Sequence, residues 1–160
     1  MADKEKITII LFSGEMDKAL AAFNIALGGA SSGMDVTIFF TFWGLNVIKK
    51  NEGNIKSKGI MRNMLNAMNR GGAKRLPLSQ FHMLGIGKAM MQGLMKDINF
   101  PQVDELIITA KELGVKFIAC TTSMGMMGIG KDAFIEGVDS YAGVATYIAE
   151  TRESKINLFI

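Results

Sequence analysis

Residues 114–128 read GVKFIACTTSMGMMG, and this stretch decides the fold. Its first half, 115–119, is a short apolar run that predicts a buried strand. The second half is small and polar, and it predicts a turn into a short helix with Ser123 as the N-cap. Cys120, the only cysteine of the sequence, lies at the junction. Reactive groups collect outside the carboxyl ends of strands in open α/β sheets, so Cys120 is the candidate functional group.

The position of Cys120 predicts a reactive thiol. A helix that begins just after it would place unpaired backbone N–H groups near the sulfur, which lowers the pKa of a thiol and favours the reactive thiolate. We therefore expect a sulfur that is ionised and reachable at the edge of the sheet. The alternative is an inert structural cysteine, because free cysteine is among the most buried residue types. A sulfur enclosed by aliphatic groups, with no opening, would favour that alternative.

The composition limits the classes of protein. With 160 residues, 49% of them hydrophobic and 21% charged, we expect a single domain, 1–160, with a sizeable core. A net charge of +3 without a Lys/Arg run gives no nucleic-acid face. One cysteine and one histidine leave no internal disulfide and no metal site built on cysteine clusters or paired histidines. The lone thiol and the absence of a signal-peptide pattern favour the cytoplasm. The longest apolar stretch, 36–48, is shorter than the ~20 residues of a membrane span.

Apolar runs and helical spacing alternate along the chain. This β-α-β alternation predicts a parallel sheet with right-handed crossovers. Segment 61–95 is rich in methionine, which indicates either flexible core filling or an adaptable contact surface, and the latter favours oligomerisation. Strands are predicted at 7–12, 35–41, 115–119 and 156–160, and helices at 16–30, 45–50, 61–68, 81–95, 103–113 and 140–151.

Three motifs resemble the DsrE/DsrF/DsrH-like sulfur-transfer proteins. They are FSGEMDKA at 12–19, TIFFTFWGL at 37–45, and ACTTSM at 119–124 followed by Gly128. Their order and spacing match the family from residue 7 to residue 160. The resemblance implies a three-layer α/β/α domain with a mainly parallel sheet of about five strands. Cysteines and membrane segments that some relatives add are absent, so neither disulfide resolution within the chain nor membrane attachment is supported.

The resemblance also implies a chemistry. It makes Cys120 the residue that carries sulfane sulfur as a persulfide, without a metal or an organic cofactor. It implies homo-oligomers, often trimers or hexamers, and partners such as TusA-like carriers and rhodanese-like donors.

Several residues are candidates for lining the site around Cys120. Those at the ends of other strands could equally form turns or pack in the core, and the histidine could serve as a base or simply be a hydrogen-bonded surface or core residue. Met124 is expected to pack around the thiol or against a neighbouring subunit. The candidates are Thr121, Thr122, Ser123, Met124, Ser13, Gly14, Trp43 and His82.

The sequence therefore favours a cytoplasmic sulfurtransferase or sulfur carrier that acts through Cys120. One competing hypothesis is a non-catalytic oligomeric subunit or interaction module in which Cys120 is inert. Another is a thiol redox sensor that forms a sulfenic acid with peroxide. A third, a nucleotide- or flavin-binding protein, is disfavoured because neither G-x-x-x-x-G-K-[ST] nor a G-x-G-x-x-G after the first strand is present.

Overall fold

The computed structural model describes residues 4–51 and 56–160. Its centre is a five-stranded parallel sheet in the order β4-β3-β2-β1-β5. The strands are β1 (Lys6–Leu11), β2 (Asp35–Phe40), β3 (Lys116–Cys120), β4 (Ser140–Ala142) and β5 (Ile156–Phe159). The α-helices are α1 (Met16–Ser31), α2 (Ile60–Met68), α3 (Ile86–Asp97), α4 (Val103–Glu112), α5 (Thr121–Met127) and α6 (Val144–Arg152). The 3₁₀ turns are η1 (Phe42–Ile48), η2 (Met83–Gly85) and η3 (Lys131–Ala133).

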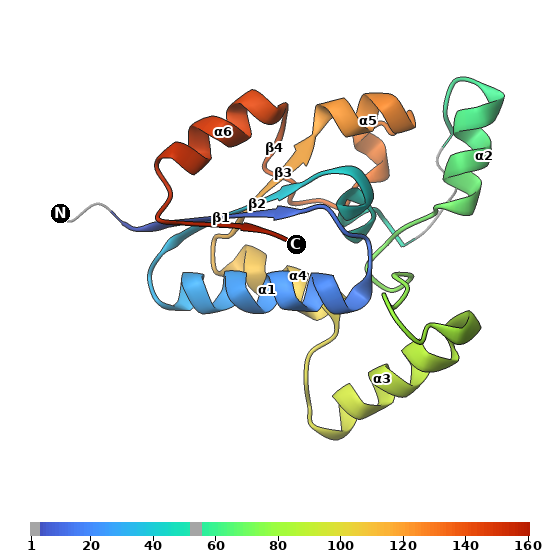
Figure 1. The fold of residues 1–160 in the computed structure, drawn as a ribbon, viewed down its shortest axis with the longest axis horizontal. Coiled ribbons are helices and arrows are strands. Elements are labelled where there is room, and N and C mark those ends of the chain that lie inside the picture. Colours follow the sequence, from blue (N-terminus) through green and yellow to red (C-terminus); the bar gives the residue numbers. More distant parts are fainter. Residues whose placement is uncertain (1–3, 52–55) are drawn as a thin grey trace.

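The elements form three layers, which confirms the α/β/α fold class. Helices α1 and α4 cover one face of the sheet, and α5 and α6 cover the other (Figure 1). Alternate residues of β1, such as Ile9 and Leu11, are buried with Phe23 of α1 in the larger core. Phe39, Ile118 and Cys120 point to the opposite face and form a smaller cluster there with Tyr147 of α6.

Strand β4 corrects the prediction of a helix from residue 140. Ser140–Ala142 pair with β3 instead, and α6 begins only at Val144. Asp139 holds this edge, because its Oδ2 accepts hydrogen bonds from the Phe117 N–H at 2.7 Å and the Lys111 Nζ at 2.6 Å. A strand of three residues is too short for a periodic pattern, so the apolar positions of the following helix dominated the prediction.

Two other segments differ from the predicted helices. The helix expected at 81–95 is broken, because Leu84 (φ 56°) and Gly85 (φ 100°), both within η2, adopt left-handed backbone conformations just before α3 begins. The helix expected at 45–50 is the 3₁₀ turn η1. Lys49 lies beyond that turn and forms an isolated bridge with Phe134.

Helices α2 and α3 stand away from the three layers, on the side where the strands end (Figure 1). Each buries a single residue, Asn66 in α2 and Met95 in α3. We call residues 56–96, which include α2 and nearly all of α3, the arm. In residues 4–51 and 56–160, no helix combines the length and the hydropathy that crossing a membrane requires.

Candidate functional site

Cys120 is both the last residue of β3 and the N-cap of α5. The prediction that Ser123 would be the N-cap is wrong. The strand leads into the helix without an intervening loop, so the helix begins at Thr121 and Ser123 lies within its first turn. From this position the Ser123 hydroxyl reaches across to the end of the neighbouring strand β2.

Two hydroxyl groups meet beside the sulfur. Thr41 Oγ1, just beyond β2, lies 3.0 Å from Ser123 Oγ, and Ser123 Oγ also accepts a hydrogen bond from the Phe42 N–H at 3.1 Å. The two hydroxyls have two protons, and the hydrogen bond between them uses one. Whichever residue donates that bond, one O–H proton of the pair remains for another acceptor. This O–H can donate a hydrogen bond to the thiolate of Cys120, and such a bond is strong because the acceptor is charged.

The pKa of Cys120 reflects these contacts. Burial raises the pKa of the thiol, but hydrogen bonds from the Ser123 N–H, from the Thr41 and Ser123 hydroxyls and from the Thr122 N–H outweigh burial. The net effect lowers the pKa below the ordinary value of a cysteine. The arrangement therefore favours the thiolate, which is the nucleophilic form.

The expectation of an openly reachable sulfur is wrong for this conformation of the single chain. Cys120 is only 1% exposed and packs with Phe39, Ile118 and Tyr147. Its surroundings are not purely apolar, however, because Thr41 and Ser123 contribute hydroxyl groups. Thr121 and Thr122, the next two residues, are exposed, so solvent lies one residue away along the chain.

The FFTFWG segment supplies the β2 side of the site. Thr41 contributes a hydroxyl, and Phe42 has a left-handed backbone (φ 51°) while its N–H donates to Ser123 Oγ. Gly44 allows the chain to double back, because a Cβ at this position would lie 1.8 Å from the Leu11 carbonyl oxygen. The motif is thus explained by one hydrogen-bonding side chain, one strained backbone position and one close approach between main chains.

Gly14 and Trp43 are linked to the site of Cys120 indirectly, through Phe42. A Cβ on Gly14 would lie 2.7 Å from the Trp43 carbonyl oxygen, and the Trp43 ring packs edge-on against Phe42 with 5.2 Å between ring centroids. The Ser13 N–H donates to the Ile160 carbonyl at 3.3 Å, so Ser13 serves the turn between β1 and α1. Met124 is buried in the larger core rather than in the cluster of Cys120.

His82 belongs to a different part of the molecule. Its Nδ1 accepts a hydrogen bond from the Leu78 N–H at 3.3 Å, within the loop that leads to η2. This contact orders a turn of the arm. The geometry offers no support for His82 as a base toward Cys120.

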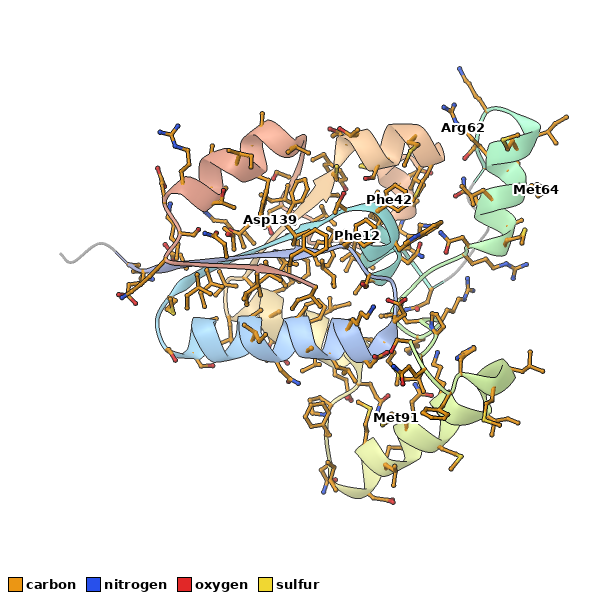
Figure 2. The ribbon with its side chains drawn as sticks, in the orientation of Figure 1. Phe12, Phe42, Arg62, Met64, Met91 and Asp139 are labelled. Atoms are coloured by element: carbon orange, nitrogen blue, oxygen red, sulfur yellow. The ribbon has the colours of Figure 1, made fainter. Side chains whose placement is uncertain are left out.

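An aromatic row that the sequence analysis did not identify runs across the carboxyl edge of the sheet. Phe12 stacks on Phe42 with 5.4 Å between ring centroids (Figure 2). Phe12 also stacks on Phe159 at 5.7 Å, and Phe42 packs against Trp43. Phe12, Trp43 and Phe159 are 36%, 37% and 68% exposed. The sequence places Phe12 and Phe159 each at the end of a predicted strand. That the two rings lie side by side could not be predicted, because it depends on the pairing of β1 with β5.

These features define a parallel α/β protein with a hydrogen-bonded cysteine at the carboxyl edge of its sheet. Residues 3–159 match the model of the DsrE/DsrF/DrsH-like family, and the chain belongs to this family.

Two known proteins are similar in sequence to this chain over nearly their whole lengths. YrkE of Bacillus subtilis is 42% identical over 156 residues, which cover 98% of this chain and 97% of YrkE. The sulfur carrier protein DsrE2 of Allochromatium vinosum is 34% identical over 161 residues, 99% of each chain. Among solved structures, the protein of unknown function MTH1491 from Methanobacterium thermoautotrophicum is similar, with a TM-score of 0.55, 11% identity, and coverage of 98% of this chain and 100% of MTH1491. This last similarity is one of fold.

Proposed function

We propose that this protein is a cytoplasmic sulfur carrier, a single domain that holds sulfane sulfur as a persulfide on Cys120 and passes it to the thiol of a partner protein. The observation that carries the proposal is the set of hydrogen bonds around Cys120, which lower its pKa in spite of its burial. A cysteine that served only to fill the core would gain nothing from two hydroxyls and two backbone N–H groups beside its sulfur. The family and a relative named a sulfur carrier support the same chemistry.

The cycle requires no net oxidation. The Cys120 thiolate attacks the outer sulfur of a donor persulfide, an S–S bond forms at Sγ, and the donor's own S–S bond breaks as its thiolate leaves with the electron pair. In the second step the partner's thiolate attacks the outer sulfur on Cys120, and Sγ departs as the thiolate that Thr41 and Ser123 stabilise. TusA-like carriers and rhodanese-like donors are the partner classes that suit these two steps.

Burial of the sulfur means that each transfer needs a local opening. Tyr147 and Phe39, with ring centroids 5.0 Å apart, lie in the cluster that encloses Cys120. Tyr147 comes from α6, whose Val144 and Ile148 are 55% and 50% exposed. A helix with so little buried surface is a low-stability element, and its movement would uncover the sulfur without unfolding the sheet.

We also propose that the protein is a homo-oligomer, a trimer or hexamer. The exposed members of the aromatic row, Phe12, Trp43 and Phe159, form an apolar surface where β1 and β5 end. Exposed apolar patches of this kind mark interfaces between proteins.

The proposal is tested by incubating the protein with a persulfidated donor and weighing it intact. We expect the wild type to gain the mass of sulfur, and Cys120→Ser to gain none. A second incubation with a small thiol should return the wild type to its original mass. Wild-type protein that stays unmodified by persulfide, polysulfide and thiosulfate would support the inert-subunit hypothesis, and sulfenic acid formation with peroxide in the absence of sulfur loading would support the redox sensor.

A further inference from the structure

The arm is strongly basic. Residues 56–96 contain eight of the 18 Lys and Arg residues and none of the 15 Asp and Glu residues. The rest of the sequence therefore carries an excess of negative charge. Seven of the eight basic residues are exposed, and Lys74 alone among the eight has a carboxylate partner in the described residues, Asp104 at 3.6 Å. The eight are Lys56, Lys58, Arg62, Arg70, Lys74, Arg75, Lys88 and Lys96.

The arm also exposes apolar side chains in an ordered pattern. Met61, Met64 and Met68 follow helical spacing along one face of α2 and are 80%, 59% and 82% exposed. Figure 2 shows Met64 directed away from the sheet. Because methionine is unbranched and polarizable, such a stripe adapts to the shape of a partner surface.

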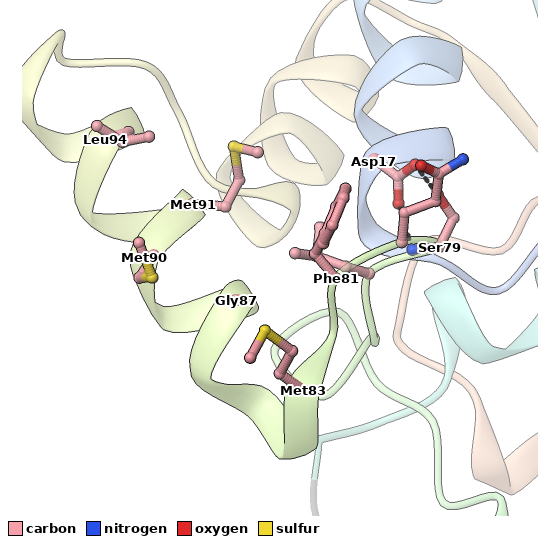
Figure 3. Close-up of a pocket in the computed structure, with 10 residues that line it drawn as sticks. Asp17, Ser79, Phe81, Met83, Gly87, Met90, Met91 and Leu94 are labelled. Atoms are coloured by element: carbon pink, nitrogen blue, oxygen red, sulfur yellow. Dashed lines mark hydrogen bonds between the residues drawn. The ribbon is translucent and has the colours of Figure 1, made fainter.

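A hollow of about 550 Å³ lies between α3 and the loop that precedes it. Phe81, Met83, Met90 and Leu94 line it, and Asp17 and Ser79 close one end (Figure 3). The Asp17 carboxylate already accepts hydrogen bonds from the N–H and the hydroxyl of Ser79. The hollow therefore offers apolar contact within a basic segment.

The arm is joined to the helix that follows Cys120. Asn66 of α2 donates from Nδ2 to the Met127 carbonyl at 3.1 Å, and Arg62 lies against Gly128, at the end of α5. Both α5 and the arm lie on the side of the sheet where the strands end (Figure 1). A macromolecule that approaches Cys120 along this side therefore meets Arg62 and the methionines of α2.

We propose that the arm is the docking surface for a partner protein with an acidic surface, and that this protein is the one that exchanges sulfur with Cys120. The second clause rests on the proposed function. Carboxylates on the partner would match the unpaired basic groups, and its apolar side chains would contact the methionine stripe and the hollow. The amino-end edge of the sheet in a second copy of this chain matches the arm less well, because its carboxylates Glu5, Asp35 and Glu153 already form ion pairs with Lys155, Lys4 and Lys6.

The test uses Cys120→Ser protein, so that no covalent chemistry contributes. The probes are a fluorescent helical peptide with Glu on one face and Leu on the other, and a counterpart with Lys in place of Glu. We expect the acidic peptide to bind, its affinity to fall with added salt, and the basic peptide to show no binding. The triple variant Arg62→Gln/Arg70→Gln/Arg75→Gln should weaken binding about tenfold, because several exposed charge pairs are lost together. A matched control, Lys4→Gln/Lys116→Gln/Lys155→Gln, removes three positive charges at the amino ends of the strands and should leave binding unchanged.

Equal binding of the two peptides, or an equal loss in both triple variants, would overturn the proposal. So would a change in molar mass of the arm variant by light scattering, which would assign the arm to a second copy. Sedimentation of the protein with phosphatidylglycerol vesicles, without binding of the acidic peptide, would assign the arm to a lipid surface and overturn it too. Normal peptide binding together with failed sulfur loading of the wild type would overturn the proposed function and leave the arm as a docking surface for an acidic partner intact.

Discussion

The backbone N–H of Phe42 donates a hydrogen bond to Ser123 Oγ at 3.1 Å, which ties the end of β2 to the first turn of α5. This bond orients the hydroxyl that acts on Cys120. It also satisfies a donor at a backbone position with φ of 51°, where a residue other than glycine is strained. Cys120 and the two strands beside it are thus tied together through Ser123.

Replacement of Ser123 by alanine should raise the pKa of Cys120. The thiolate loses a hydroxyl partner, while burial, which favours the neutral thiol, remains. Alkylation of Cys120 by iodoacetamide, followed as a function of pH, should shift toward higher pH and become slower at pH 7. The free energy of unfolding should fall by about 1–2 kcal/mol, because the Phe42 N–H loses its acceptor. Thr122→Ala is the control: the contribution of Thr122 comes from its backbone, so an equal shift in that variant would contradict the assignment.

Removal of the Tyr147 ring should uncover Cys120. Tyr147→Ala takes away a ring that packs with the cysteine, so the rate of reaction with Ellman's reagent should rise by about tenfold. Stability should fall by about 3 kcal/mol, as for other buried aromatic truncations. Ile148→Ala changes an exposed neighbour on the same helix and should leave the rate unaltered. An unchanged rate in Tyr147→Ala would show that the sulfur opens on another side.

Lys49 should make stability depend on pH in the alkaline range. It is 1% exposed, its Nζ donates to the Asn69 carbonyl, and burial lowers its pKa to about 8. Between pH 8 and the ordinary pKa of 10.5, the unfolded chain binds more protons at this residue than the folded chain, so stability rises with pH across that window. Below pH 8 both states are protonated, and the full cost of the buried charge remains.

Replacement of Lys49 by methionine should therefore stabilise the protein at pH 7 by on the order of 2 kcal/mol. This figure combines a relief of about 3 kcal/mol from the pKa difference with a loss of about 1 kcal/mol for the hydrogen bond. Chemical denaturation at pH 7 and pH 10 should show a smaller difference for the variant than for the wild type. Lys50→Met, at an exposed neighbour, should reproduce neither effect.

Gly44→Ala should destabilise the protein by at least about 3 kcal/mol, because the added methyl group would meet the Leu11 carbonyl oxygen at 1.8 Å. Gly28 of α1 is the matched control, since a Cβ there meets nothing within 4 Å. Gly28→Ala should stabilise by about 0.5–1 kcal/mol through helix propensity. Thermal unfolding of the two variants should therefore shift in opposite directions, and equal shifts would refute the close approach of η1 to β1.

The buried strands were predictable because their sequences are short apolar runs, as in 7–12 and 115–119, which lie within one residue of β1 (Lys6–Leu11) and β3 (Lys116–Cys120). The position of Cys120 at a strand end followed from the same pattern. The burial of Cys120 could not be predicted in the same way. It results from packing with Tyr147 of α6, and α6 follows β4, which the sequence did not reveal. The contact between the Thr41 and Ser123 hydroxyls could not be predicted from the sequence either. The two residues are 82 positions apart in the chain, and only the pairing of β2 with β3 brings them together.

Strand β4 contains only three residues, and one of them, Ala142, pairs with Cys120. In a hydrogen-exchange experiment, its amides should lose protection well before those of β1 and β2, which are paired on both sides. Cys120 thus lies beside the pairing between β3 and β4, which we expect to open before the other strand pairings. Separation of β4 from β3 would expose the sulfur while β1 and β2 remain paired, so access to Cys120 and the stability of the central sheet depend on different strand pairings.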